Sequence, residues 1–136
     1  MIIFNKRNFL HIVTVPFIWA PFIPTLFVHL LMAIYQFVSF PIYGLEKVRL
    51  RDYLNFDRRK LKYIKGIDKI NCAYCAYANA IFMYFSEIAH RTEFYWCGVK
   101  HSNQPDNPAF AYQEKFAPYG DKRSYEQMLQ RTRHRK

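Results

Sequence analysis

The sequence predicts an all-α protein with an N-terminal membrane anchor, and three observations support this prediction. Residues 8–45 contain no Asp, Glu, Lys or Arg. Between positions 63 and 88, apolar and aromatic residues recur at the period of an α-helix. The chain of 136 residues has only four glycines, which argues against an all-β fold with its many tight turns. We divide the chain into a membrane anchor (1–45), a basic collar with a helical domain that carries Cys and His (46–121), and a basic C-terminal tail (122–136).

The anchor is predicted to lie in lipid. No polar face recurs in it every three or four positions, as one would in a water-soluble core helix. Prolines kink or end helices, and four occur here: Pro16, Pro21, Pro24 and Pro41. We therefore expect two arms, 9–20 and 25–40, about 18 and 24 Å long at the helical rise. Neither arm alone crosses a hydrocarbon core of about 30 Å.

Basic residues flank the anchor on both sides, with Lys6 and Arg7 before it and Lys47, Arg49 and Arg51 after it. Positive residues stay on the cytoplasmic side of a membrane. A helical hairpin that dips into the bilayer and returns fits both flanks. The alternative is a single tilted span formed by the second arm, with the first arm in the interface. We expect residues 46–136 on the cytoplasmic side, where thiols stay reduced.

The collar between Glu46 and Asn71 carries nine Lys or Arg against four acidic residues. Anionic headgroups attract such a cluster by about 1 kcal/mol per basic residue. A basic, aromatic segment also suits nucleic acid. Because the collar directly follows the anchor, the lipid bilayer with its anionic headgroups is the expected partner rather than nucleic acid. A solvated helix face without a specific partner is the remaining alternative.

One long helix is predicted from about 59 to 97, with a bend near Gly66 or Asn71 and with Gly98 just past its end. Its apolar stripe alternates spacings of four and three: Tyr63, Ile67, Ile70, Tyr74, Tyr77, Ile81, Tyr84 and Ile88. A buried tyrosine hydroxyl needs a hydrogen-bond partner. We therefore expect this face to meet polar groups or the membrane interface.

The three cysteines and one histidine form the pattern C-x2-C-x21-C-x3-H, with Cys72, Cys75, Cys97 and His101. Three thiolates and an imidazole suit zinc, with iron as the alternative. On one straight helix, however, Cys75 and Cys97 lie about 33 Å apart. The helix could end near His90 and double back, or two chains could pair antiparallel as a homodimer. The cysteines could also be small buried apolar residues, or serve in thiol chemistry.

No catalytic set can be assigned, so the sequence favours a protein without enzymatic activity. Glu87, His90 and Glu93 follow each other at three-residue spacing, and E-x-x-H is half of a carboxylate-bridged di-iron site. The second half is missing from the sequence. Polarity of the helix surface is a sufficient reason for these three residues.

The segments NCAYCAYANA, EIAHRTEFYWCGVKH and FAPYGD resemble an uncharacterised family of small bacterial membrane-associated proteins with NCxYCxYAN and RTExYWCxxKH motifs. The resemblance covers about residues 50–121. This sequence has Ala80 where the family pattern has Gly, and Gly98 where it has Pro. The expected location is the bacterial inner (cytoplasmic) membrane. The resemblance supports treating the three cysteines and His101 as one set. It brings no established activity.

These observations lead to two hypotheses. The first is a membrane-anchored accessory or assembly subunit that docks on other membrane-protein subunits and holds a structural Cys3His metal site. The second is a membrane-bound redox protein that depends on a metal or on thiols.

The C-terminal region is expected to be an ordered loop and a last short helix that begins at Ser124, where S-Y-E-Q resembles a capping box.

Overall fold

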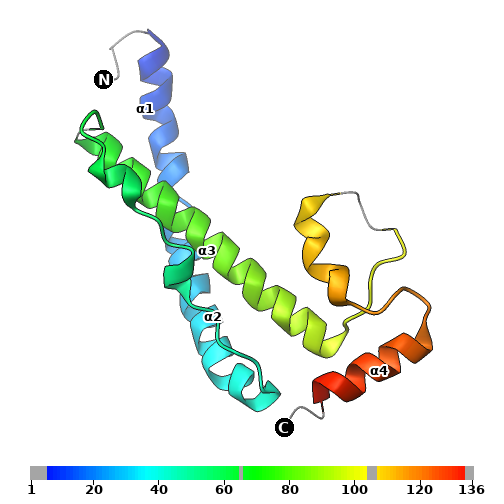
Figure 1. Ribbon diagram of the computed structural model, residues 1–136. Coiled ribbons are helices and arrows are strands. Elements are labelled where there is room, and N and C mark those ends of the chain that lie inside the picture. Colours follow the sequence, from blue (N-terminus) through cyan, green and yellow to red (C-terminus); the bar gives the residue numbers. More distant parts are fainter. Residues whose placement is uncertain (1–5, 65, 104–106, 134–136) are drawn as a thin grey trace.

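The computed structural model describes residues 6–64, 66–103 and 107–133, apart from the side chains at 6–9, 11 and 59 (Figure 1). Within these residues all regular secondary structure is helical, which confirms the all-α prediction. A single isolated β-bridge joins Val99 to Ala117. The α-helices are α1 (Lys6–Trp19), α2 (Phe22–Tyr43), α3 (Ile67–Trp96) and α4 (Lys122–Arg133), and the 3-10 helices are η1 (Leu50–Asp52), η2 (Asp57–Lys60) and η3 (Pro108–Lys115).

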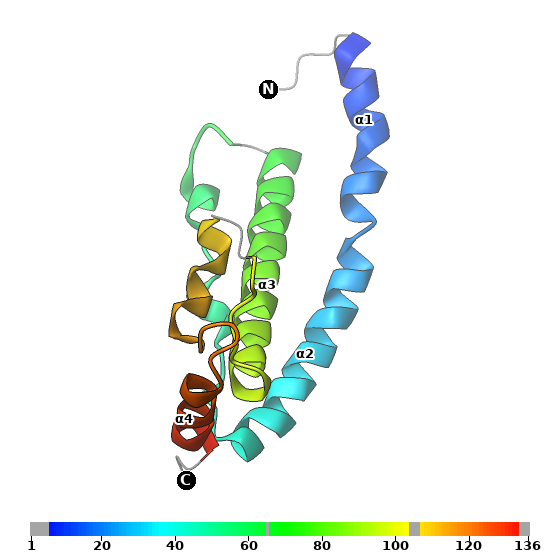
Figure 2. The ribbon, with the colours of Figure 1, turned by 90° about the vertical axis from the view of Figure 1, so that its right-hand side faces the viewer.

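The helices α1 and α2 follow one another in the same direction and form one bent rod (Figures 1 and 2). The backbone N–H of Ala20 donates to Pro16 (2.8 Å) and that of Thr25 donates to Pro21 (2.9 Å), so helical bonding continues up to the break on both sides. The hairpin predicted at these prolines is therefore wrong, because they bend the rod without reversing it. The chain turns back only after Gly44, whose φ of 69° suits glycine.

One stretch of the described chain, Ile12–Tyr43, is helical, long and apolar enough to cross a membrane by length and composition. This stretch includes most of α1 and all of α2. It lies near the N-terminus, as the sequence predicts for the anchor. The anchor is thus one continuous rod, and its candidate span includes residues of the first arm as well as the second (Figure 2).

The helices α2 and α3 run in the same direction, with α3 slanted across the rod, because the chain between them returns beside α3 (Figures 1 and 2). We call residues 45–64 the return segment. The first turns of the two helices are joined where Trp19, just before α2, stacks on Tyr74. Their last turns are joined where Tyr43 stacks on Tyr95 with the same ring separation of 4.5 Å. Parallel helices thus pack along most of their length, with the return segment beside them.

The core lies near the C-terminal ends of α2 and α3, where the return segment leaves α2. Its buried members are Phe40 from α2, Val48 from the return segment, and Tyr84 and Ile88 from α3. Three elements therefore share one cluster. This cluster holds the return segment against both helices.

The ends of α3 are set by glycines. Gly66 precedes its first residue with a φ of 57°, so α3 begins at Ile67 and not near 59 as predicted. The helix continues without a break to Trp96, next to the predicted end at about 97, so the alternative in which it ends near His90 is not observed. Gly98 has a φ of 56°, and its N–H donates to the carbonyl of Glu93 at 3.0 Å. Gly98 is thus the residue after the helix end, as predicted.

Beyond α3, the 3-10 helix η3 packs back on the last turns of α3, and α4 follows it (Figure 2). The helix α4 begins at Lys122, two residues before the predicted start. Its first turn is capped by Asp121, whose carboxylate accepts the N–H of Ser124 at 3.0 Å. Bonds from the Ser124 hydroxyl and backbone lower the pKa of Asp121. Asp121, and not Ser124, therefore supplies the cap.

Candidate functional site

The tyrosine stripe of α3 faces α1 and α2, and its hydroxyls bond polar groups there. The Tyr74 hydroxyl donates to the carbonyl of Ile18 at 2.9 Å. The Tyr77 hydroxyl lies 3.1 Å from Nδ1 of His29. This confirms that the stripe meets polar groups. The stripe does not stay covered throughout, because Tyr63, Ile67 and Ile70 at its start are exposed.

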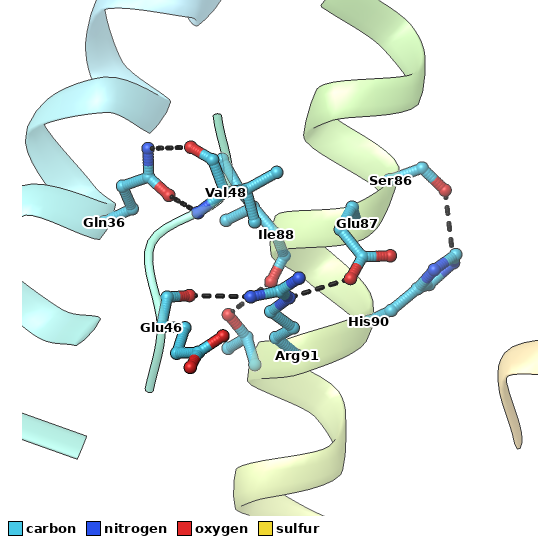
Figure 3. Close-up of polar contacts among 9 residues, drawn as sticks. Gln36, Glu46, Val48, Ser86, Glu87, Ile88, His90 and Arg91 are labelled. Atoms are coloured by element: carbon cyan, nitrogen blue, oxygen red, sulfur yellow. Dashed lines mark hydrogen bonds and ion pairs between the residues drawn. The ribbon is translucent and has the colours of Figure 1, made fainter. Parts of the chain in front are cut away.

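The buried amide of Gln36 joins three elements. Its Oε1 accepts the N–H of Val48 at 2.9 Å, and its Nε2 donates to the carbonyl of the same residue at 3.1 Å (Figure 3). The same Nε2 also donates to the hydroxyl of Tyr84 at 2.6 Å. Helix α2, the return segment and α3 are thereby tied through one side chain that is only 8% exposed.

The helix α2 has its polar residues inside and its apolar residues outside. All its polar side chains, among them Thr25, His29 and Gln36, are buried or half-buried. All its exposed side chains are apolar: Ile23, Pro24, Leu26, Phe27, Val28, Leu30, Leu31, Ile34, Phe37, Val38, Pro41 and Ile42. We call this set the outer face of α2. A narrow polar line therefore does exist in the anchor, contrary to the sequence prediction, and it is turned toward α3.

An open cleft of about 830 Å³ lies between the C-terminal half of α2, the return segment and α3. Basic side chains in its wall include Lys47, Arg49 and Arg91. The guanidinium of Arg91 is already engaged: Nε pairs with Glu87 at 2.7 Å, and Nη1 donates to the carbonyl of Glu46 at 2.8 Å (Figure 3). Arg91 thus holds the return segment, and its charge is offset inside the protein.

The cysteine and histidine set is divided between the two ends of α3. Cys72 is half-buried and Cys75 exposed in the first turns, whereas Cys97 and His101 are exposed beyond the last turn. All three cysteines are free thiols. In the part of the chain that the structure describes, no three His, Cys, Asp or Glu side chains lie together as a group that could hold a metal ion. One chain on its own therefore does not bring the four residues together.

The surroundings of the cysteines also bear on two alternatives, namely cysteines buried in the core and a metal site shared by two antiparallel chains. Cys75 and Cys97 are exposed, so they are not buried core residues. Cys97 lies on the same side of α3 as His90, two turns away. The ring of Tyr112 in η3 covers His90, at a centroid distance of 3.5 Å. An antiparallel pair of chains that meets through this side of α3 would have to displace η3.

Glu87, His90 and Glu93 each bind a different neighbour. Glu87 pairs with Arg91, and Nε2 of His90 lies 3.1 Å from the hydroxyl of Ser86 (Figure 3). Glu93 accepts the hydroxyl of Tyr112 at 3.0 Å. The three side chains therefore serve contacts within and beyond α3 and do not converge on one point.

A small polar cluster fixes η3 on α3. The imidazole of His90 and the ring of Tyr112 stack with an interplanar angle of 10°. Gln113, which is fully buried, donates from Nε2 to the Tyr112 hydroxyl at 2.9 Å. Burial lowers the pKa of His90 and outweighs the opposing charges of Glu87 and Glu93. Burial also raises the pKa of Tyr112. Both rings are thus held in their neutral forms near neutral pH.

Sequence reasoning missed Gln36 and Gln113. Each is a long amide inside an otherwise apolar or irregular segment. A signal for Gln36 did exist, because Thr25, His29 and Gln36 fall at helical spacings of four and seven and share one side of the helix.

No family model matches this chain, and no curated protein and no solved structure matches it either.

Proposed function

We propose that this protein is a membrane-anchored accessory or assembly subunit, without enzymatic activity of its own, that attaches to the cytoplasmic face of a bacterial inner membrane. The observation that carries the proposal is the outer face of α2. It is a continuous apolar surface, while the polar residues of the same helix point into the protein. In water such a surface is unfavourable, at about 25 cal/mol per Å² of apolar area. In lipid it is the expected arrangement.

The charge distribution supports the same attachment. Seven Lys or Arg lie between Lys47 and Lys62, and those described are exposed. The ammonium of Lys47 lies 4.2 Å from the centre of the Phe37 ring, at the edge of the outer face. A long basic side chain that covers an apolar ring while its charge stays at the border suits the headgroup level of a bilayer. Anionic headgroups are therefore the proposed partner of the collar.

The structural Cys3His site remains part of the proposal and rests on the sequence spacing. The pairs at the two ends of α3 each offer two ligands, and a tetrahedral zinc ion needs four. Docking on another subunit, or on a second copy after η3 has moved, would complete the ligand set. Zinc is the proposed metal, and iron with redox activity is the competing function.

Attachment can be tested by fractionation of cells that produce the chain with its native membranes. We expect the wild type to remain with membranes after an alkaline wash. Leu30→Glu places a charge in the middle of the outer face, where the side chain is exposed, and should move the protein to the soluble fraction. Tyr119→Glu is the matched control, because Tyr119 is a large exposed side chain outside α1 and α2, at 68% against 58% for Leu30. If Leu30→Glu stays with membranes, the outer face is not the attachment surface.

The metal is tested separately by elemental analysis of the purified wild type and of Cys75→Ser. Stoichiometric zinc that is lost in the variant supports the structural site. Iron with a visible absorption band supports the redox alternative instead. A metal-free wild type removes the metal site from the proposal and leaves the membrane attachment intact.

A further inference from the structure

We propose that α2 lies in the plane of the membrane, with its outer face against the acyl chains of one leaflet, and does not cross the bilayer. This inference rests on the proposed membrane attachment and assigns its geometry. It departs from both arrangements that the sequence suggested. The partner of the outer face is thus a lipid surface, contacted from one side only.

The first argument is the length of the rod that is free of other elements. Within the rod, the part that extends past the start of α3 belongs to α1 (Figure 2). Its 14 residues measure about 21 Å, which is short of a hydrocarbon core of about 30 Å. Leu10, Ile12 and Phe17 of α1 are exposed, so α1 extends the apolar surface of α2. A span would therefore have to include α2.

The second argument is what α2 would carry with it. Because α3 runs in the same direction as α2 and contacts it where Phe22 meets Tyr74 and where Tyr43 meets Tyr95, an α2 that crosses the bilayer takes α3 across as well. The return segment runs back beside α3 over the same distance (Figures 1 and 2). Exposed Arg49 and Asp52 of this segment line one cleft with Gln36 of α2, so they would then lie at membrane depth. Exposed charges in the hydrocarbon are strongly unfavourable.

The in-plane arrangement avoids this conflict. The buried polar line of α2 bonds α3 and the return segment, so the charged elements lie on the side of α2 that is away from the outer face. With the outer face toward the acyl chains, these elements remain in water or among headgroups. Helices with one apolar and one polar side bind membranes in this way. Here the polar side is formed by packed neighbours and not by α2 itself.

The depth of three positions distinguishes the arrangements. Ile23, Leu30 and Phe37 are all exposed and lie on one side of α2 at seven-residue spacing, about 10.5 Å apart along the axis. In a span they occupy three different depths. In the in-plane arrangement they share one depth. A single tryptophan is introduced at each position in the full-length chain, after Trp19→Phe and Trp96→Phe have removed the native indoles.

The variants are bound to vesicles of phosphatidylcholine and phosphatidylglycerol whose acyl chains are brominated near the headgroup, in the middle or near the methyl end. We expect all three tryptophans to lose most of their fluorescence with the same brominated lipid. Ala109→Trp, exposed on η3 away from α2, should keep its fluorescence. Different depths for Ile23, Leu30 and Phe37 would overturn the in-plane arrangement and leave membrane attachment standing. Absence of quenching at all three would mean that protein covers the outer face, and would overturn both. Circular dichroism confirms that each variant keeps its helices.

Discussion

The side-chain amide of Gln36 forms hydrogen bonds with both the N–H and the C=O of Val48, as the backbone of a neighbouring β-strand would. The two hydrogen bonds measure 2.9 and 3.1 Å, and both residues are buried. A chain segment without secondary structure must satisfy its buried N–H and C=O groups from elsewhere. Gln36 does this for Val48 and thereby fixes where the return segment leaves α2.

Replacement of Gln36 by leucine should lower the free energy of unfolding by about 2–4 kcal/mol, because two buried backbone groups lose their partner. Leucine keeps most of the volume, so packing contributes little to the change. The measurement is denaturant unfolding in detergent micelles. The control is Phe37→Leu, at the next position, which is 69% exposed and should cost far less. Equal losses in the two variants would show that the amide bonds do not stabilise this junction.

Much of the fold can be predicted from the sequence, and the predictions that the structure contradicts have identifiable causes. The spacing of Tyr74, Tyr77 and Ile81 predicted the inner face of α3 because burial of one helix face dominates the pattern. The predicted hairpin is wrong because it requires a turn at Pro21 and Pro24. Proline removes a donor and bends a helix, whereas reversal needs a backbone that turns, as Gly44 provides.

The candidate site was less predictable, because its contacts join residues that are distant in the chain. Gln36 bonds Tyr84 across 48 positions, and Tyr112 bonds Glu93 across 19. No local pattern encodes such pairs. The C-x2-C and C-x3-H pairs were visible in the sequence, but their separation depends on whether α3 breaks, and α3 is continuous.

The stacking of Trp19 on Tyr74 should hold α1 to the start of α3. Tyr74 also donates to the carbonyl of Ile18, one of the last carbonyls of α1, which a helix end leaves without a partner. Trp19→Ala should therefore lower the protection of α1 against hydrogen exchange and leave α3 after Tyr84 unchanged. Phe17→Ala, an exposed position on the same helix, is the control. Loss of protection to the same degree in both variants would show that this contact does not anchor α1.

Gly98→Ala should destabilise the end of α3 by roughly 1–3 kcal/mol, since a non-glycine residue in the left-handed region is strained. A methyl group at this position would also overlap the end of the Met128 side chain and lie 3.0 Å from the carbonyl of Phe94. The φ of 56° likewise excludes proline at this position. Thermal unfolding of the variant provides the measurement.

Gly120→Ala separates the strain from the overlap. Gly120 has a φ of 78°, and an added methyl group meets nothing within 4 Å. We expect the Gly98 variant to be less stable than the Gly120 variant by the cost of moving Met128. Met128→Ala in the Gly98→Ala background should then restore part of the difference. If the two glycine variants are equally stable, Met128 moves aside freely and does not pack on this turn.

The contact between η3 and α3 should weaken as the pH falls below about 6.5, the ordinary pKa of histidine. The pKa of His90 is lowered in the folded chain, chiefly because the ring is removed from water beneath Tyr112. The unfolded chain therefore binds a proton more readily than the folded one. The stabilisation is complete above the ordinary pKa and is lost as the pH falls toward the lowered value.

Hydrogen exchange of the peptide that contains η3 measures this effect, with wild type and His90→Gln compared at equal pH. Glutamine cannot take up a proton, so the variant should show no extra loss of protection on acidification, whereas the wild type should. The bond between the Phe116 N–H and the carbonyl of Gln113 is a suitable reporter, since Phe116 is buried against Phe94. The comparison also removes the contribution of the other histidines, which are present in both proteins. An identical acid response in the two proteins would assign the pH dependence to groups other than His90.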